Sequence, residues 1–138
     1  MGKFQSTKLF DGFSCVFRQW KAKNTHCRFM HGYGVSFRVW FEGSLDDRNW
    51  VWDFGDMKRA QTKIDGMSPK AWMDYMFDHT ILVAKDDPMI NLINDLEHNQ
   101  IAQVRVVEAT GAEKFAEFIF GKLNKFVQTE TNGRVRVA

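Results

Sequence analysis

Two stretches near the N-terminus alternate apolar and polar residues, and this pattern constrains the fold more than any other feature of the sequence. Between residues 7 and 20, one face carries Phe13, Cys15 and Phe17. Residues 35–42 alternate more sharply, and one face there carries Val35, Phe37, Val39 and Phe41. A period of two residues is typical of half-buried strands. We therefore expect an antiparallel pair of strands with one face in the core.

Helical spacing dominates the rest of the chain. Asp53 is expected to cap a helix whose inner face carries Met57, Ala60 and Ile64. Ser68-Pro69 and Asp87-Pro88 each predict another helix start, because proline suits the first helical turn. The apolar stripe expected after Pro88 comprises Met89, Leu92, Ile93 and Leu96. Residues 110–113 have capping-box spacing before a helix over 112–126, and strands are expected over 103–107 and 134–137. The predicted class is α+β.

Composition excludes several classes of function. The 138 residues fit one domain over 1–138, and a formal net charge of +2 argues against nucleic acid or an anionic membrane as a partner. No apolar run is long enough to span a bilayer, and the N-terminus lacks the apolar stretch of a secretory signal. Two cysteines do not make a disulfide framework, so we expect a reducing, cytoplasmic location.

The segment that joins the two predicted strands holds the first candidate chemical groups: His26, Cys27 and His31. A thiol there could accept a proton if a cation or an imidazole lowered its pKa. Alternatively, Cys27 is simply a small apolar residue, which its spacing alone favours. The same three side chains could also bind zinc, although three ligands within one loop are a weak signal.

Asp78-His79 is the second candidate. A carboxylate can orient an imidazole and stabilise its charged form, which would make a proton relay. Adjacent residues need not face each other, however, and the alternative is a helix end with a solvated histidine.

Taken in order, these segments resemble the 6-pyruvoyl-tetrahydropterin synthase family, which includes 6-carboxytetrahydropterin synthase. The resemblance is carried by Phe13-Ser14-Cys15-Val16-Phe17, by residues 27–33 (Cys-Arg-Phe-Met-His-Gly-Tyr), by residues 50–58 around Trp52-Asp53-Phe54, by Phe77-Asp78-His79-Thr80-Ile81-Leu82, and by Thr110-Gly111-Ala112-Glu113. Five matches in the family's order span most of the chain.

The resemblance implies a tunnelling fold (T-fold), an antiparallel sheet with helices layered on one face, assembled as a homo-oligomer, commonly a hexamer. It also implies that Cys27 acts as general base, aided by Asp78 and His79. Three family histidines hold zinc, which polarises oxygens of the substrate side chain. The implied substrate is a small pterin-like molecule in pterin (tetrahydrobiopterin) or 7-deazaguanine (queuosine) biosynthesis.

The sequence departs from the family at its zinc positions, which correspond to Phe17, His31 and Tyr33. Of these, His31 is a good ligand, whereas phenylalanine has no lone pair to offer and neutral tyrosine is a poor donor. We therefore expect no tight zinc site in the family geometry. We also expect the domain to lack the family's last strand and its pterin-anchoring glutamate, a role that Glu108 and Glu113 do not inherit.

Two functions remain open at this stage. The first is a carbon–oxygen or carbon–carbon lyase acting on a dihydroneopterin-triphosphate-like substrate, which the retained Cys27, Asp78 and His79 favour. The alternative is a metal-free, catalytically impaired T-fold relative that binds a pterin or purine ring or serves only as structure. A nucleic-acid binder ranks last, because the chain has no basic stripe.

Overall fold

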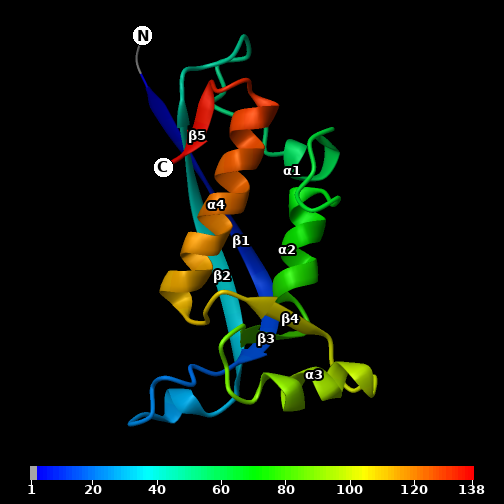
Figure 1. Ribbon diagram of the computed structural model, residues 1–138. Coiled ribbons are helices and arrows are strands. Elements are labelled where there is room, and N and C mark those ends of the chain that lie inside the picture. Colours follow the sequence, from blue (N-terminus) through cyan, green and yellow to red (C-terminus); the bar gives the residue numbers. More distant parts are fainter. Residues whose placement is uncertain (1–2) are drawn as a thin grey trace. The chain divides into compact units, whose positions relative to one another are not determined.

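Five strands form one sheet in the computed structural model of the chain, which describes residues 3–138 (Figure 1). Their bounds are β1 Phe4–Phe17, β2 His31–Gly43, β3 Thr80–Ala84, β4 Val104–Val107 and β5 Val135–Val137. The order across the sheet is β4-β3-β1-β2-β5. The two strands predicted from alternation are therefore neighbours, and the α+β class is confirmed.

The sheet is mixed, whereas the expected sheet was antiparallel. β2 and β5 pair antiparallel, with Phe41 opposite Val137. β1 pairs in parallel with β3, and β3 pairs in parallel with β4. Parallel neighbours need a crossover connection, and α3 (Ile90–His98) lies in the connection from β3 to β4.

The helix expected after Asp53 is a single turn, α1 (Asp56–Arg59). It ends because Ala60 is extended, and Ile64 instead forms an isolated β-bridge with Met67. α2 (Pro69–Phe77) begins at the predicted proline, and the Ser68 hydroxyl accepts a hydrogen bond from the Ala71 amide at 3.3 Å.

The apolar stripe expected on α3 is narrower than predicted. Ile93 is buried in a cluster with Val83 and Val104, but Met89 and Leu92 are 46% and 58% exposed. One helix face contacts β3 and β4, so residues at the margins of the stripe stay in solvent.

None of the helices within residues 3–138 is both long and apolar enough to cross a lipid bilayer.

The longest helix, α4 (Ala112–Glu130), buries the predicted side chains of Phe115, Ile119, Leu123 and Phe126. Thr110, however, is not the N-cap residue, because α4 begins at Ala112 and the Phe115 amide donates to the Gly111 carbonyl at 2.9 Å. The Thr110 hydroxyl instead donates to the Arg18 carbonyl at 2.6 Å. β5 follows a turn at residues 131–134, and its bounds lie within the strand predicted over 134–137.

The chain divides into two compact units. The first comprises the residues up to Asp11 with 36–72 and 118–138, and the second comprises 12–35 and 73–117. In the first unit, Trp52 contacts Phe41 and Phe126, with ring centroids 4.8 and 5.8 Å away. In the second unit, Phe115 meets Phe17 and Phe77 edge-on at 4.9 and 5.6 Å. Such tilted and edge-to-face arrangements are favourable for aromatic rings and stabilise the core of each unit separately.

Candidate functional site

Asp78 and His79 lie in the second unit where α2 ends and β3 begins. The Ser14 amide donates to Asp78 Oδ1 at 3.0 Å, and the His79 amide donates to the Ser14 carbonyl at 2.6 Å. These two bonds fasten the Asp-His dipeptide to β1 by its backbone and its carboxylate. The Gln103 side chain adds a third contact by donating to the His79 carbonyl at 3.2 Å.

The side chains of this pair face each other. His79 Nε2 lies 3.6 Å from Asp78 Oδ2, an ion-pair distance that is too long for a hydrogen bond. The imidazole is 79% exposed and Asp78 is 29% exposed. His79 also adopts φ +59°, a left-handed conformation that is uncommon outside glycine. The dipeptide therefore presents an imidazole to solvent with a carboxylate beside it, a pair that can exchange and stabilise a proton.

Cys27 lies in the short 3-10 helix η1 (His26–Arg28), on a loop of the second unit. Its amide donates to the Thr25 hydroxyl at 3.1 Å, and its carbonyl accepts from the Gln19 amide at 2.8 Å. The residue is half-buried and its thiol is free. Within residues 3–138, no hydrogen bond or ion pair joins the Cys27 side chain to Asp78 or His79, so the structure holds two separately anchored groups.

The three positions matched to family zinc ligands form part of an aromatic stack. Phe17 is 5% exposed, and its ring lies parallel to that of Tyr33 with centroids 4.2 Å apart. The His31 ring meets Tyr33 edge-on at 6.1 Å. Over the described part of the chain, no cluster of three His, Cys, Asp or Glu side chains could hold a metal ion. The donor set does not fit zinc, because stacked rings stand where imidazoles would be needed.

Cys15 is a second thiol close to Asp78, and sequence reasoning assigned it only to the core. Burial, and to a lesser extent the Asp78 carboxylate, raises the pKa of Cys15 to about 11. A thiol with so high a pKa stays protonated near neutral pH and is a poor base or nucleophile. Its alternation with Phe13 and Phe17 correctly indicated burial, and its buried surroundings exclude it from proton transfer.

A buried ion pair fixes the end of β1 in the same unit. Arg18 Nε and Nη2 donate to the two carboxylate oxygens of Asp87 at 2.8 and 2.5 Å. The Asp87 carboxylate also accepts from the Met89 amide at 2.9 Å, just before α3 begins. The Arg18 guanidinium holds the pKa of Asp87 below its ordinary value.

The two glutamates considered as anchors for a pterin ring have other surroundings. Glu108 pairs with Lys85 at 2.6 Å, and Glu113 lies in the first turn of α4.

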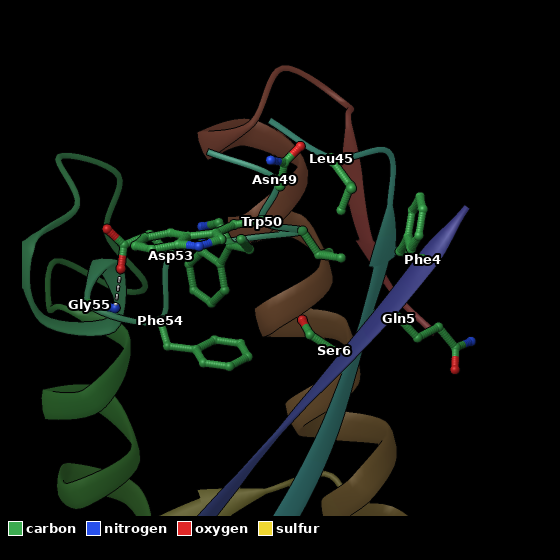
Figure 2. Close-up of a pocket in the computed structure, with 11 residues that line it drawn as sticks. Phe4, Gln5, Ser6, Leu45, Asn49, Trp50, Asp53, Phe54 and Gly55 are labelled. Carbon is green, nitrogen blue, oxygen red and sulfur yellow. Dashed lines mark hydrogen bonds between the residues drawn. The ribbon is translucent and has the colours of Figure 1, made fainter. Parts of the chain in front are cut away.

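The first unit contains a cavity of about 550 Å³ that the sequence did not reveal (Figure 2). It is lined by Phe4, Gln5, Ser6, Leu45, Asn49, Trp50, Val51, Trp52, Asp53, Phe54 and Gly55. We call it the aromatic cavity, because four of these side chains are rings. The aromatic run at 50–54 was the available signal, but nothing in that run indicated that the start of β1 would complete the wall.

The chain is similar to known proteins in both sequence and fold. The family model described as 6-pyruvoyl tetrahydropterin synthase matches residues 7–138. Among solved structures, the uncharacterized protein WS1659 from Wolinella succinogenes is similar, with a TM-score of 0.76 and 20% identity. That match covers 99% of this chain and 90% of the other, and at this identity it supports the fold alone. A search of curated proteins gave no match.

Proposed function

The chain belongs to the 6-pyruvoyl tetrahydropterin synthase family, and we propose that it is a metal-independent member that binds a pterin- or purine-like ring without the family's zinc-dependent lyase chemistry. The proposal rests on the stacked pair of Phe17 and Tyr33. Zinc in protein sites is held by thiolate, imidazole or carboxylate groups. A phenyl ring and a phenol packed face to face supply none of these.

Loss of the metal would alter the chemistry strongly. A bound metal stabilises developing oxyanion charge by several kcal/mol, so a chain without it would lose on the order of a thousandfold or more in rate. The pair of Asp78 and His79 could still move a proton, but no positive centre would polarise the substrate oxygens. Ring recognition does not depend on that centre and can persist without turnover. Assembly as a homo-oligomer is part of this proposal.

A second candidate is a lyase of altered mechanism on a dihydroneopterin-triphosphate-like substrate. It is favoured by one observation, the side chains of Asp78 and His79 held 3.6 Å apart with the imidazole in solvent. In that case Cys27 would serve as general base, with Asp78 and His79 assisting. The two candidates differ in one readout, turnover that depends on Cys27.

Metal content is the first test. The protein is incubated with zinc, separated from free ion and analysed by elemental mass spectrometry, and we expect far less than one zinc per chain. The matched control is the double substitution Phe17→His with Tyr33→His, which restores imidazoles beside His31 and is expected to bind about one zinc per chain. About one zinc in the unaltered chain would reject the proposal.

Ligand binding and turnover are measured on the same preparation. Calorimetry with 7,8-dihydroneopterin and with guanine should give binding that Cys27→Ala leaves intact, together with no conversion of dihydroneopterin triphosphate. Conversion that Cys27→Ala abolishes would establish the second candidate. If neither ring binds, the ring-binding proposal is wrong.

A further inference from the structure

The aromatic cavity has the size of a small-molecule site. Its volume of about 550 Å³ lies within the roughly 300–1,000 Å³ typical of ligand pockets. Figure 2 shows Phe4 and Ser6 on the N-terminal strand facing the segment that carries Trp50 and Phe54. Both segments belong to the first unit, so the cavity lies within one compact body.

The surface that the cavity offers to a ligand is mainly aromatic. Phe4 and Trp50 are 50% and 47% exposed, so their rings have surface that a ligand can cover. Two polar atoms of the lining, Ser6 Oγ and Trp52 Nε1, are covered by protein atoms and take no part in binding. Trp52 itself contacts three other rings, which keeps this part of the wall ordered. Exposed rings on an ordered wall suit a ligand with an aromatic body.

The carboxylate of the lining is already paired. Asp53 accepts from the Gly55 amide at 2.9 Å, and its other oxygen lies 3.2 and 3.3 Å from guanidinium nitrogens of Arg48 and Arg59. Arg48 also stacks over the Trp50 ring at 4.2 Å. Because two arginines compensate its charge, Asp53 does not attract a cationic ligand.

Lys8 places a cation beside the cavity. Phe4, Ser6 and Lys8 follow one another at intervals of two residues along β1, so their side chains lie on the same face of the strand. Lys8 Nζ lies 6.0 Å from the centroid of the Phe54 ring, which lines the cavity. Figure 2 shows Asp53 on the side of the cavity away from Phe4. Among the hydrogen bonds and ion pairs of residues 3–138, none involves the Lys8 side chain, so its ammonium is available to a ligand.

We propose that the aromatic cavity binds an amphipathic monoanion, an aromatic ring system that carries a carboxylate. The ring system covers Phe4, Trp50 and Phe54, and the carboxylate pairs with the exposed Lys8 ammonium and remains hydrated. An ion pair in solvent is worth no more than about fivefold in affinity. The ring contacts therefore supply most of the affinity, and Lys8 selects the charge of the ligand.

This goes beyond the proposed function, because the two concern different parts of the chain. The cavity belongs to the first unit, whereas Cys27, Asp78 and the stack of Phe17 and Tyr33 belong to the second.

The test compares three probes that share one ring system and differ in charge: indole-3-acetate, the neutral indole-3-acetamide and the cation tryptamine. The five tryptophans each give an indole N–H signal in a ¹H–¹⁵N correlation spectrum of the labelled full chain. The Trp50 signal is assigned by its loss in Trp50→Phe. At pH 7.5 and low salt, indole-3-acetate should shift it saturably, with a dissociation constant of about 1 mM, as expected for a fragment in a formed pocket. The Trp40 signal should not shift, because Trp40 lies outside the lining.

The charge of the probe and of residue 8 should decide the order of affinities. Indole-3-acetamide should bind about three- to fivefold more weakly than indole-3-acetate, and tryptamine more weakly still. In Lys8→Met, which keeps the length of the side chain, indole-3-acetate should bind no better than indole-3-acetamide. The matched control is Lys23→Met, an exposed lysine of the second unit, which removes the same charge and should keep the preference. Cys27→Ala should also keep it, so failure here and failure of the proposed function are distinguishable.

Three results would overturn the proposal. The first is no shift of the Trp50 signal up to about 5 mM indole-3-acetate, well above the expected dissociation constant. The second is equal binding of indole-3-acetate and indole-3-acetamide, or a preference that survives Lys8→Met. The third is a dependence of the Trp50 signal on protein concentration without probe, which would show that a second copy covers the cavity.

Discussion

Replacing Asp87 by asparagine removes one charge of the buried pair with Arg18 while keeping the side-chain volume. The carboxylate is 1% exposed and accepts two hydrogen bonds from the guanidinium. The asparagine amide retains one acceptor oxygen and turns its NH₂ group toward Arg18 or the Met89 amide. Both of those groups are donors, so at least one bond is lost and the cation is left unpaired.

The size of the destabilisation depends on how well water can solvate the unpaired Arg18 guanidinium. Removing one partner of a buried ion pair costs about 3–5 kcal/mol. Arg18 is 23% exposed, so solvent can stabilise the unpaired guanidinium in part. We therefore expect the free energy of unfolding to fall by about 3 kcal/mol, at the lower end of that range.

The effect should depend on pH in a defined direction. The pKa of Asp87 in the folded state lies below its ordinary value. Its ionised carboxylate therefore stabilises the folded protein at every pH above that ordinary pKa. The contribution is lost as the pH falls below about 4 and through the folded-state pKa. The difference between the unaltered chain and Asp87→Asn should therefore narrow in acid.

Urea unfolding followed by far-UV circular dichroism, at one protein concentration and at several pH values, measures both effects. The matched control is Asp86→Asn, the neighbouring aspartate, which pairs with Lys21 at 3.3 Å in solvent. Exposed pairs contribute under about 1 kcal/mol. The reasoning is refuted if Asp87→Asn costs no more than Asp86→Asn, or if its cost does not change with pH.

Two further predictions concern backbone packing and thiol reactivity. Gly43→Ala should lower the free energy of unfolding by about 1–3 kcal/mol, because a Cβ there would overlap the Arg134 carbonyl. The control Gly34→Ala, on the same strand, places its Cβ in open space and should change stability little. Equal melting temperatures of the two variants would contradict this prediction. Iodoacetamide at pH 8 should alkylate Cys27 well before Cys15, because Cys15 is buried and its pKa is raised to about 11. Peptide mass spectrometry that shows the reverse order would contradict the burial of Cys15.

The strands other than β3 could be predicted from the sequence, because the burial of their residues follows a local alternation. No strand was expected at Thr80–Ala84. Val39 and Phe41 alternate with solvent-facing residues in β2, and the structure buries both. In β1 the alternation changes phase at Gly12, whose φ of +83° lets both Phe10 and Phe13 be buried. An unbroken period of two residues predicts that Phe13 is buried but does not predict the burial of Phe10.

The candidate site was only partly predictable. Whether Asp78 and His79 face each other was left open by the sequence, and the structure brings their side chains to 3.6 Å with His79 at φ +59°. The aromatic cavity could not be predicted, because Ser6 and Trp52 lie far apart in the sequence and line the same cavity only in the folded chain. The parallel direction of β3 and β4 was missed for a similar reason, since strand direction is set by the connections and not by periodicity.

The left-handed backbone of His79 changes how substitutions at this position should be interpreted. A residue with a Cβ stores about 1–2 kcal/mol of strain at such a φ, and glycine does not. His79→Ala and His79→Gly both delete the imidazole, yet they should differ in stability by roughly that amount, with the glycine chain the more stable. A loss of function shared by both belongs to the missing ring, and a loss confined to one belongs to the backbone.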